Sequence, residues 1–343
     1  MHEHGPSEGH DLVVVGASAG GVEALSALVS ALPRDFAASV CIVLHLPAGG
    51  TSVLAEILSR AGALPATTAV DGHPLARACI VVAPPDFHLT VVDGRVQLTH
   101  GPRENGHRPA IDTLFRSAAE ARGRQTVGVI LSGTLDDGAL GLKEIKRAGG
   151  ATIVQDPETA RYNGMPRNAI SVADPDLVLP LEGIPAALVE LAEDPPNPGQ
   201  EVTMEMEENG RPNFKEEVEQ GSAQHAQPGE LVPVMCPECG GSLWMEEMRN
   251  GALAFRCRVG HAFGPQSLAA EQGRTLESAL WSSLRLLEER ASLSERLAER
   301  FAGAARSSRW FAQQAEELQE HAVALRRMLD DLEAMPPGEA GGE

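Results

Sequence analysis

The sequence predicts an α/β fold with a doubly wound, mostly parallel sheet, followed by a small Cys/His module and a helical C-terminal segment. Three observations predict this architecture. Short, almost continuously apolar runs recur along the first half of the chain, as in strands covered on both faces. Segments with helical spacing and length alternate with these runs, which is typical of parallel strands joined by crossover helices. A late cluster of cysteines and a histidine indicates a separate module held by metal.

The expected elements follow each other from Asp11 to about Ala192. The strand-like runs are 12–16, 39–46, 78–84, 126–133 and 151–156. The helical segments between them are 20–32, 51–61, 110–121 and 138–148. One detour breaks the alternation, because HLTVVDGRVQLT contains Asp93-Gly94, a two-residue turn signal. We therefore expect a β-hairpin inserted into the sheet domain.

The composition excludes several classes of protein. The chain has 343 residues, with 28 Lys+Arg against 48 Asp+Glu and a formal net charge of −20. Such an acidic chain is a poor ligand for nucleic acid, whose phosphates are contacted by clustered Lys and Arg. No apolar run approaches the ~20 residues that span a bilayer. The first residues, MHEHGPSEGH, lack the basic start and apolar run of a secretory signal. We expect a cytoplasmic, multi-domain protein that is not inserted in a membrane.

Changes in composition along the chain predict four parts. Residues 10–193 form the α/β domain. Residues 194–231 are rich in Pro, Gly and Glu without apolar periodicity, so we expect a disordered acidic linker. Residues 232–264 form the Cys/His module. Residues 265–335 have helical spacing throughout, and Gly303 marks the turn of an antiparallel helical hairpin.

A turn of small residues follows the first expected strand. In Gly16-Ala17-Ser18-Ala19-Gly20-Gly21 the glycines and alanines permit a tight strand-to-helix turn that presents the Ser18 hydroxyl over the sheet edge. The same turn aims backbone N–H groups of the helix N-terminus into that space, where they could stabilise an oxyanion. A Gly-rich first turn is also how nucleotide-binding sheets hold phosphate, so this motif alone leaves both functions open.

Three features favour a serine nucleophile over a nucleotide site. The second strand leads to His45, where a dinucleotide site would have an acidic residue. No Gly-Lys-Ser/Thr sequence occurs, which excludes a P-loop. The strand over 126–133 leads into Asp136 and Asp137, at the sheet edge where open α/β folds bind ligands. A serine hydroxyl needs a base, and an imidazole needs an orienting carboxylate. Ser18, His45 and Asp137 therefore predict a catalytic triad, with Asp136 as the alternative third member.

The same residues resemble those of a known family, the CheB-type chemotaxis protein-glutamate methylesterases. The resemblance spans roughly residues 10–192 and rests on VVGASAGG, IVLHLPAG, IVVAPPDFHL, RPAIDTLFRSAA, VILSGTLDDGALGL and IVQDPETARYNGMPRNAI, in this order. It implies a Rossmann-like esterase domain that needs no cofactor for catalysis. It also implies that Ser18 is the nucleophile, His45 the general base and Asp137 the orienting carboxylate.

The resemblance implies a substrate and a form of regulation as well. The substrate would be glutamate methyl esters on the cytoplasmic helices of methylated chemoreceptors, hydrolysed to glutamate and methanol, and family members also deamidate receptor glutamines. Only about ten residues precede the first strand, so we expect a stand-alone form without the N-terminal receiver domain of many members. Control would then come from a separate regulator or signalling protein, or from the C-terminal module.

Two positions depart from the pattern of that family. Thr134 stands where the family's loop usually has methionine, and Ala19 replaces the threonine that commonly follows the nucleophile. Both positions border the expected oxyanion site. Among nearby polar residues, Asp112 is expected to cap a helix or to line the substrate edge. The histidines of this region are expected on the surface or in loops: His88, His100 and His107.

The late cysteines form two metal-binding knuckles. Cys236 and Cys239 are spaced C-x2-C, and Cys257 and His261 are spaced C-x3-H. Four nitrogen and sulfur ligands suit a closed, tetrahedral structural zinc site, and a β-hairpin can bridge the knuckles. Such a short segment has little core of its own, so metal would supply its folding energy. The alternative interpretation is a loop with free thiols. The remaining cysteines lie in apolar runs and are expected to be core residues: Cys41 and Cys79.

Two other functions remain open at the level of sequence. The chain could be a non-catalytic signalling adaptor that uses the esterase fold as a scaffold and the zinc and helical module for partner binding. It could also be an esterase or amidase of small molecules. The presence of Ser18, His45 and Asp137 together favours an enzyme, since a scaffold has no need of all three.

Overall fold

The computed structural model describes residues 9–46, 52–193, 229–247 and 252–334. These residues belong to two compact units, Met1–Leu268 and Ala269–Glu343. The segment expected to be a disordered linker, 194–231, lies outside the described residues except for its last three positions.

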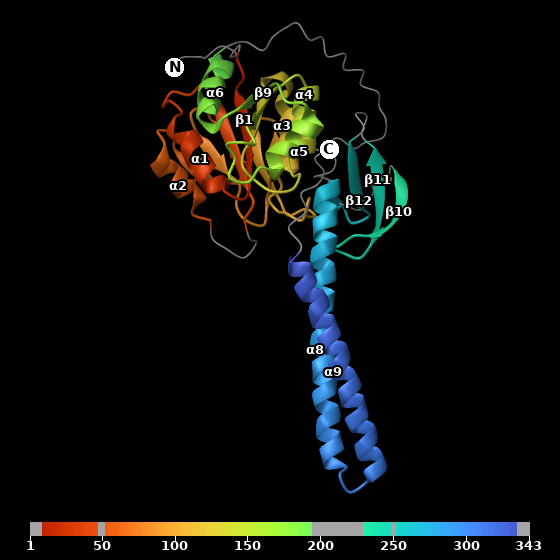
Figure 1. The fold of residues 1–343 in the computed structure, drawn as a ribbon. Coiled ribbons are helices and arrows are strands. Elements are labelled where there is room, and N and C mark those ends of the chain that lie inside the picture. The colour runs from red at the N-terminus through yellow and green to blue at the C-terminus, as the bar shows by residue number, and fades with distance from the viewer. Residues whose placement is uncertain (1–8, 47–51, 194–228, 248–251, 335–343) are drawn as a thin grey trace. The chain divides into compact units, whose positions relative to one another are not determined.

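The first unit contains a seven-stranded sheet (Figure 1). Its order is β3-β4-β2-β1-β7-β8-β9, and every neighbouring pair is parallel. The strands are β1 (Leu12–Ala17), β2 (Ser39–Leu44), β3 (Ala66–Thr68), β4 (Ile80–Val82), β7 (Thr126–Ile130), β8 (Ala151–Gln155) and β9 (Leu177–Leu179). The predicted doubly wound α/β class is confirmed. The two strands that the apolar pattern did not predict, β3 and β9, are three-residue edge strands with mostly exposed side chains.

Helices cover both faces of this sheet (Figure 1). One face carries α1 (Gly21–Ser30), α2 (Leu54–Ala61) and α6 (Ile184–Glu193). The other carries α3 (Ile111–Arg122), α4 (Ala139–Arg147) and α5 (Gly164–Ala173). Single 3₁₀ turns occur at Gly123–Gln125 and Leu181–Gly183. Alternate residues of β1 enter the two cores, Val13 and Val15 on one side and Leu12 and Val14 on the other. Burial on both faces is why this strand has a continuous apolar sequence.

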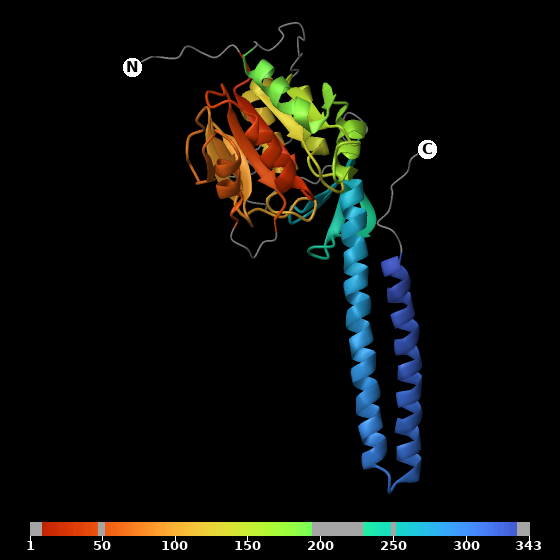
Figure 2. The ribbon, with the colours of Figure 1, turned by 60° about the vertical axis from the view of Figure 1, so that its left-hand side comes forward.

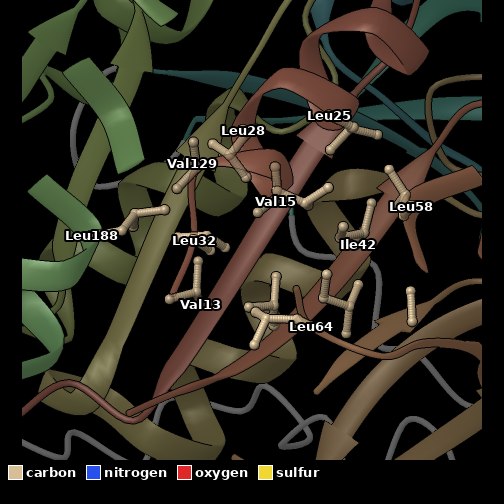
Figure 3. Close-up of a cluster of buried hydrophobic side chains, with 14 of the residues drawn as sticks. Val13, Val15, Leu25, Leu28, Leu32, Ile42, Leu58, Leu64, Val129 and Leu188 are labelled. Atoms are coloured by element: carbon tan, nitrogen blue, oxygen red, sulfur yellow. The ribbon is translucent and has the colours of Figure 1, made fainter. Parts of the chain in front are cut away.

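The core beneath α1 and α2 fixes the turn that follows β1. In Figure 3, Val15 of β1 lies beside Leu25 and Leu28 of α1, with Ile42 of β2 and Leu58 of α2 in the same cluster. All five side chains are completely buried. Burial of one such side chain stabilises the fold by about 1.5–3 kcal/mol. The strand end and the helix start on either side of Ser18 are therefore held in one position.

The expected hairpin is present between β4 and α3. Strands β5 (His88–Val92) and β6 (Arg95–Thr99) pair antiparallel around Asp93-Gly94. Both turn residues have positive φ, 50° and 72°, as a type I′ turn requires. The apolar residues Leu89, Val91 and Val96 pack into the core on the α3 side of the sheet.

Two of the three histidines of this region lie where they were expected. His100 is exposed beside Asp86, and His107 lies in the loop before α3. The expectation for His88 is wrong, because strand β5 is buried on both faces. Its side chain is buried, and its Nε2 lies 2.9 Å from the carbonyl oxygen of Pro102.

The Cys/His module is a four-stranded antiparallel sheet in the order β10-β11-β12-β13. Its strands are β10 (Glu230–Met235), β11 (Ser242–Glu247), β12 (Leu253–Cys257) and β13 (Ala262–Phe263). Its buried core consists of Cys236, Leu243, Cys257, Phe263 and Leu268. Such a small core contributes little to the free energy of folding, so a module of this size needs a further stabilising element such as a bound metal ion.

The C-terminal residues form a helical hairpin of α8 (Pro265–Arg300) and α9 (Ala305–Ala334), which lie side by side in both ribbon views (Figures 1 and 2). The turn between them contains Gly303, as expected. Leu284, Ala322 and Leu329 are buried between the helices. Larger side chains remain exposed, among them Trp281 and Trp310. In the described part of the chain, no helix combines the length and the apolar character needed to cross a bilayer.

Candidate active site

Three neighbouring strands deliver Ser18, His45 and Asp137 to one edge of the sheet. Strand β1 lies between β2 and β7, and Ser18 and His45 come directly after β1 and β2. Backbone pairing continues past the strand ends. The Ser18 N–H donates to Ser132 O (3.0 Å), and the His45 N–H donates to Ala17 O (3.2 Å). Asp137 ends the loop between β7 and α4. The parallel sheet thus sets the spacing of the three residues.

The three side chains form a continuous hydrogen-bonded chain. His45 Nδ1 lies 3.1 Å from Ser18 Oγ, and His45 Nε2 lies 2.7 Å from Asp137 Oδ2. The His45 and Asp137 side chains are 6% and 2% exposed. A carboxylate accepts the proton of Nε2, so the lone pair of the neutral ring is on Nδ1 and faces the serine hydroxyl. This arrangement can remove a proton from Ser18.

Asp137 is buried and accepts hydrogen bonds on both oxygens. Oδ2 also accepts from the Ile111 N–H (2.7 Å). Oδ1 accepts from the Asp112 N–H (3.1 Å) and from Asn105 Nδ2 (2.8 Å). Burial raises the pKa of Asp137, but the hydrogen bond and charge of His45 outweigh it and hold the pKa well below its ordinary value. The carboxyl group is therefore ionised and can stabilise an imidazolium.

The pKa of the neighbouring Asp112 is shifted in the opposite direction from that of Asp137. Burial, together with the charge of Asp137, raises its pKa well above the ordinary value. Its Oδ1 accepts from the Gly141 N–H at 2.7 Å, and its Oδ2 accepts from Asn105 Nδ2 at 3.0 Å. Asp112 was expected to cap a helix or to line the substrate edge. Its side chain instead links α3 to α4 behind the site.

The turn around Ser18 requires small residues. Gly20 has φ +71°, and a Cβ there would lie 3.0 Å from Ser132 Oγ. A Cβ on Gly133 would lie 3.0 Å from Ser18 Cβ and closer still to the thioether of Met165. Ala19 is half-buried, and its carbonyl accepts from Ser132 Oγ at 2.8 Å. Thr134, the other residue expected at the oxyanion site, is exposed on the loop after β7. The N-terminus of α1, with its positive dipole end, begins beside the hydroxyl.

The adjacent carboxylate, Asp136, faces away from the imidazole. It accepts from the backbone N–H groups of Gln266 and Ser267 (3.1 Å each) and from the Ser267 hydroxyl. Of the two candidates for the third position, Asp137 is the one hydrogen-bonded to His45.

The sequence did not single out Asn105 as a site residue or place His107 in the site. The rings of His107 and His45 stack, with centroids 3.6 Å apart and an interplanar angle of 13°. Asn105 donates to Asp137, as described above. The signal that the sequence offers here is the dipeptide Asn105-Gly106, which is typical of turns. In the structure both residues have positive φ, 53° and 76°. That signal predicts a bend and carries no information about which side chains the bend approaches.

The four residues expected to bind zinc lie together in the Cys/His module. The ligand atoms of Cys236, Cys239, Cys257 and His261 all lie within 4.8 Å of one another. Cys239 Sγ is 3.7 Å from Cys257 Sγ, and His261 Nδ1 is 3.7 Å from Cys236 Sγ and 3.5 Å from Cys257 Sγ. Ligand bonds of about 2.0–2.3 Å in a tetrahedron give edges of roughly 3.6–3.8 Å. Three of the six distances among these atoms lie close to that edge and all six lie within 4.8 Å, so the donor set fits one four-coordinate metal ion.

Comparison with known proteins gives consistent matches to the α/β part of the chain. The family model described as CheB methylesterase matches residues 13–188. A relative from Anaeromyxobacter dehalogenans, named protein-glutamate methylesterase/protein-glutamine glutaminase 5, is 44% identical over 184 residues, which are 52% of this chain and 51% of the relative. A putative protein of the same name from Leptospira interrogans is 37% identical over 183 residues, 53% of this chain and 95% of the relative.

A solved structure matches the same part. The crystal structure of the Thermotoga maritima CheB methylesterase catalytic domain aligns with a TM-score of 0.51 and 36% identity, covering 53% of this chain and 98% of that domain. The chain spans about half the length of the first relatives it matches, for example 53% of a second protein from A. dehalogenans. The Cys/His module and the helical hairpin lie beyond the residues that the family model matches.

Proposed function

Because the chain belongs to the CheB methylesterase family, we propose that it is a serine hydrolase that removes methyl esters from glutamate side chains of chemoreceptors. The observation that carries the proposal is the chain of contacts from Ser18 through His45 to Asp137, at 3.1 and 2.7 Å. The relatives' names also include glutaminase activity. We extend the proposal to receptor glutamines, whose amide would leave as ammonia.

In the first step, Ser18 Oγ attacks the ester carbonyl carbon while His45 Nδ1 takes the hydroxyl proton. Asp137 holds the Nε2–H and stabilises the imidazolium that forms. The tetrahedral intermediate collapses when the imidazolium returns the proton to the methoxy oxygen. Methanol leaves, and the glutamyl group remains esterified to Ser18.

In the second step, a water molecule attacks the acyl-enzyme and His45 Nδ1 takes its proton. Collapse of the second intermediate returns that proton to Ser18 Oγ and releases the glutamate carboxylate. The negative charge of both intermediates is held by backbone N–H groups at the start of α1 and in the loop bearing Thr134. Such preorganised donors contribute roughly 10²–10³ in rate. The usual threonine and methionine side chains are replaced by Ala19 and Thr134, and backbone donors survive both replacements.

The experiment is methanol release from methylated receptor membranes. Ser18→Ala is expected to abolish release. Ser26→Ala is the matched control, because Ser26 lies on α1 with its hydroxyl bonded to Val22 O, away from the site. Release that is unchanged by Ser18→Ala would refute the proposal and favour a scaffold function. Turnover of soluble esters with receptors left untouched would favour a small-molecule esterase.

We also propose that Cys236, Cys239, Cys257 and His261 bind a structural zinc ion and that residues 232–264 form a zinc ribbon. The support is the gathering of four nitrogen and sulfur ligand atoms within 4.8 Å, three of whose six distances lie close to the edge of a zinc tetrahedron. Burial lowers the pKa of His261, which favours the neutral imidazole that ligates metal. The purified protein is expected to contain about one zinc per chain. Unchanged metal content in Cys236→Ser would refute the assignment.

The proposed substrate determines the proposed location and partners. Receptor methyl esters lie on cytoplasmic helices in the family that this chain resembles, so we place the protein in the cytoplasm with methylated chemoreceptors as its partner. We propose that the C-terminal module, alone or with a separate signalling protein, regulates the esterase.

A further inference from the structure

The loop 103–107 lies between the proposed catalytic carboxylate and the C-terminal segment 262–267. Asn105 is 3% exposed, and both the nitrogen and the oxygen of its side-chain amide form hydrogen bonds. Its Nδ2 donates to Asp137 Oδ1 (2.8 Å) and to Asp112 Oδ2 (3.0 Å). Its Oδ1 accepts from the Gly264 N–H (2.7 Å), and its backbone N–H donates to Ala262 O (2.7 Å). One buried amide therefore connects the triad to the backbone of the Cys/His module.

The orientation of this amide follows from its partners. The Gly264 N–H is a donor and needs the Asn105 oxygen, so the NH₂ group has to face the Asp137 carboxylate and the Asp112 carboxyl group. A reversed amide would place NH₂ against the Gly264 N–H and an oxygen against Asp137. The C-terminal segment therefore selects the orientation in which Asn105 donates to Asp137.

Two further contacts attach the same segment and loop. Asp136, next to the triad carboxylate, accepts from the Gln266 and Ser267 N–H groups (3.1 Å each). Glu104, next to Asn105, forms a 2.8 Å ion pair with Arg116 of α3. Although Glu104 is buried, Arg116 and Arg256 of β12 lower its pKa to about 2. The neighbour of Asp137 in the sequence, Asp136, is thus bonded to residues 266 and 267. In the same way, Glu104, the neighbour of Asn105, is stabilised by the charge of Arg256 in the Cys/His module.

We propose that Asn105 is a positioning residue for ester hydrolysis and that the segment 262–267 completes the site by fixing it. The inference rests on the proposed function. Its mechanism is that the Asn105 N–H···O bond fixes the rotation of the Asp137 carboxylate, which in turn holds His45 with Nδ1 toward Ser18. Residues 262–267 lie outside the part matched by the family model, so this support belongs to the C-terminal extension of this chain.

The test compares Asn105→Ala with Thr152→Val in the full-length chain. Thr152 of β8 is equally buried, and its hydroxyl donates to Asp176 at 2.6 Å rather than to a residue of the triad. Two readouts are used: kcat and KM for methanol release, and the rate at which a fluorophosphonate labels Ser18, which needs no receptor. Asn105→Ala is expected to lower kcat and the labelling rate roughly 10-fold, the effect of one hydrogen bond to a charged group. KM is expected to stay within about 2-fold, and Thr152→Val is expected to change neither rate.

The link to the C-terminal segment is tested by a double-mutant cycle with Gly264→Pro, which removes the N–H bonded to Asn105. Because a Cβ at this position would also overlap Asp136 Oδ2, Gly264→Ala, which adds the Cβ and keeps the N–H, is the reference variant of the cycle. If both changes act through the same amide, the double variant loses no more activity than Asn105→Ala in the Gly264→Ala background. Losses that multiply would overturn the link. Wild-type rates in folded Asn105→Ala, or an equal fall in Thr152→Val, would overturn the positioning role. If Asn105→Ala did not fold, Asn105→Ser, which keeps a small polar group, gives the same comparison.

The two proposals fail separately. Wild-type protein that labels at Ser18 but releases no methanol would refute receptor demethylation, while a slower labelling of Asn105→Ala would still support the positioning role. If Asn105→Ala released methanol as fast as the wild-type protein, the positioning role would be refuted and the proposed function would stand.

Discussion

Asp137→Asn tests whether the triad works through the tautomer of His45. Asp137 accepts four hydrogen bonds: His45 Nε2 and Ile111 N on Oδ2, and Asn105 Nδ2 and Asp112 N on Oδ1. All four neighbours are donors in the wild-type protein. An asparagine has one oxygen, so its NH₂ must face two of these donors.

The contacts decide which side the NH₂ occupies. On the Oδ1 side it would face the Asp112 N–H, which is fixed in the backbone, and Asn105, which is fixed by Gly264. On the Oδ2 side it would face the Ile111 N–H, also fixed, and His45. The imidazole alone can adapt, because moving its proton to Nδ1 turns Nε2 into an acceptor. The Oδ2 side therefore leaves one donor unsatisfied and is favoured.

In that arrangement the ring presents Nδ1–H to Ser18 and is no longer a base. We expect kcat for methanol release to fall roughly 10⁴-fold, as when a triad aspartate is replaced by asparagine. The unsatisfied Ile111 N–H is expected to destabilise the fold by about 1–3 kcal/mol, measured by denaturant unfolding. The control is Asp176→Asn, which alters a carboxylate that precedes β9 and is bonded to Thr152 of β8. A kcat for Asp137→Asn within about tenfold of wild type would refute this reasoning.

Three further predictions concern other parts of the molecule. Gly133→Ala would place a methyl group 3.0 Å from Ser18 Cβ and against Met165. We expect the free energy of unfolding to fall by about 1–3 kcal/mol and a fluorophosphonate to label Ser18 more slowly. Unchanged labelling would contradict the tight packing inferred for this turn. Glu104 has its pKa lowered to about 2 from 4.5, so its ionised form stabilises the fold above the unfolded-state pKa, and this stabilisation is lost as the pH falls through about 2. Glu104→Gln is expected to be less stable than wild type by up to about 3 kcal/mol at pH 7, with the gap closing in acid unfolding experiments, and a gap independent of pH would be the contrary result. Chelation of the metal is expected to unfold the Cys/His module, measured by far-UV circular dichroism, and a spectrum insensitive to chelator would argue against a structural ion.

The sequence predicts those parts of the fold whose pattern is set by burial on two faces. Strands such as β1 and β7 lie inside the sheet and have continuous apolar runs. The edge strand β9 has three mostly exposed residues and is held by pairing with β8 and by the chain on either side. Since tertiary contacts rather than local pattern form it, no window of sequence identifies it. His88 was misplaced for a related reason: what covers the second face of β5 is not visible in the pattern of that strand.

The residues of the candidate site also fall into those that the sequence predicts and those that it does not. Ser18 and His45 follow strand ends, and strand ends of a parallel sheet meet at one edge, so topology alone brings them together. Asp136 and Asp137 are adjacent, and sequence cannot say which one faces the imidazole. Asn105 comes from a loop whose place depends on contacts with α3 and with the C-terminal segment, so a turn signal is all that its sequence provides.

The distribution of aromatic residues has a practical consequence for spectroscopy. The chain contains three tryptophans and one tyrosine. Trp244 lies on β11, Trp281 on α8 and Trp310 on α9, whereas Tyr162 lies beside Ser132 and Gly133, to which its backbone is bonded. Intrinsic tryptophan emission therefore reports on the C-terminal modules alone. The change in absorbance when the phenol ionises reports on the neighbourhood of the serine, so one unlabelled sample yields separate optical signals for the α/β domain and the C-terminal modules.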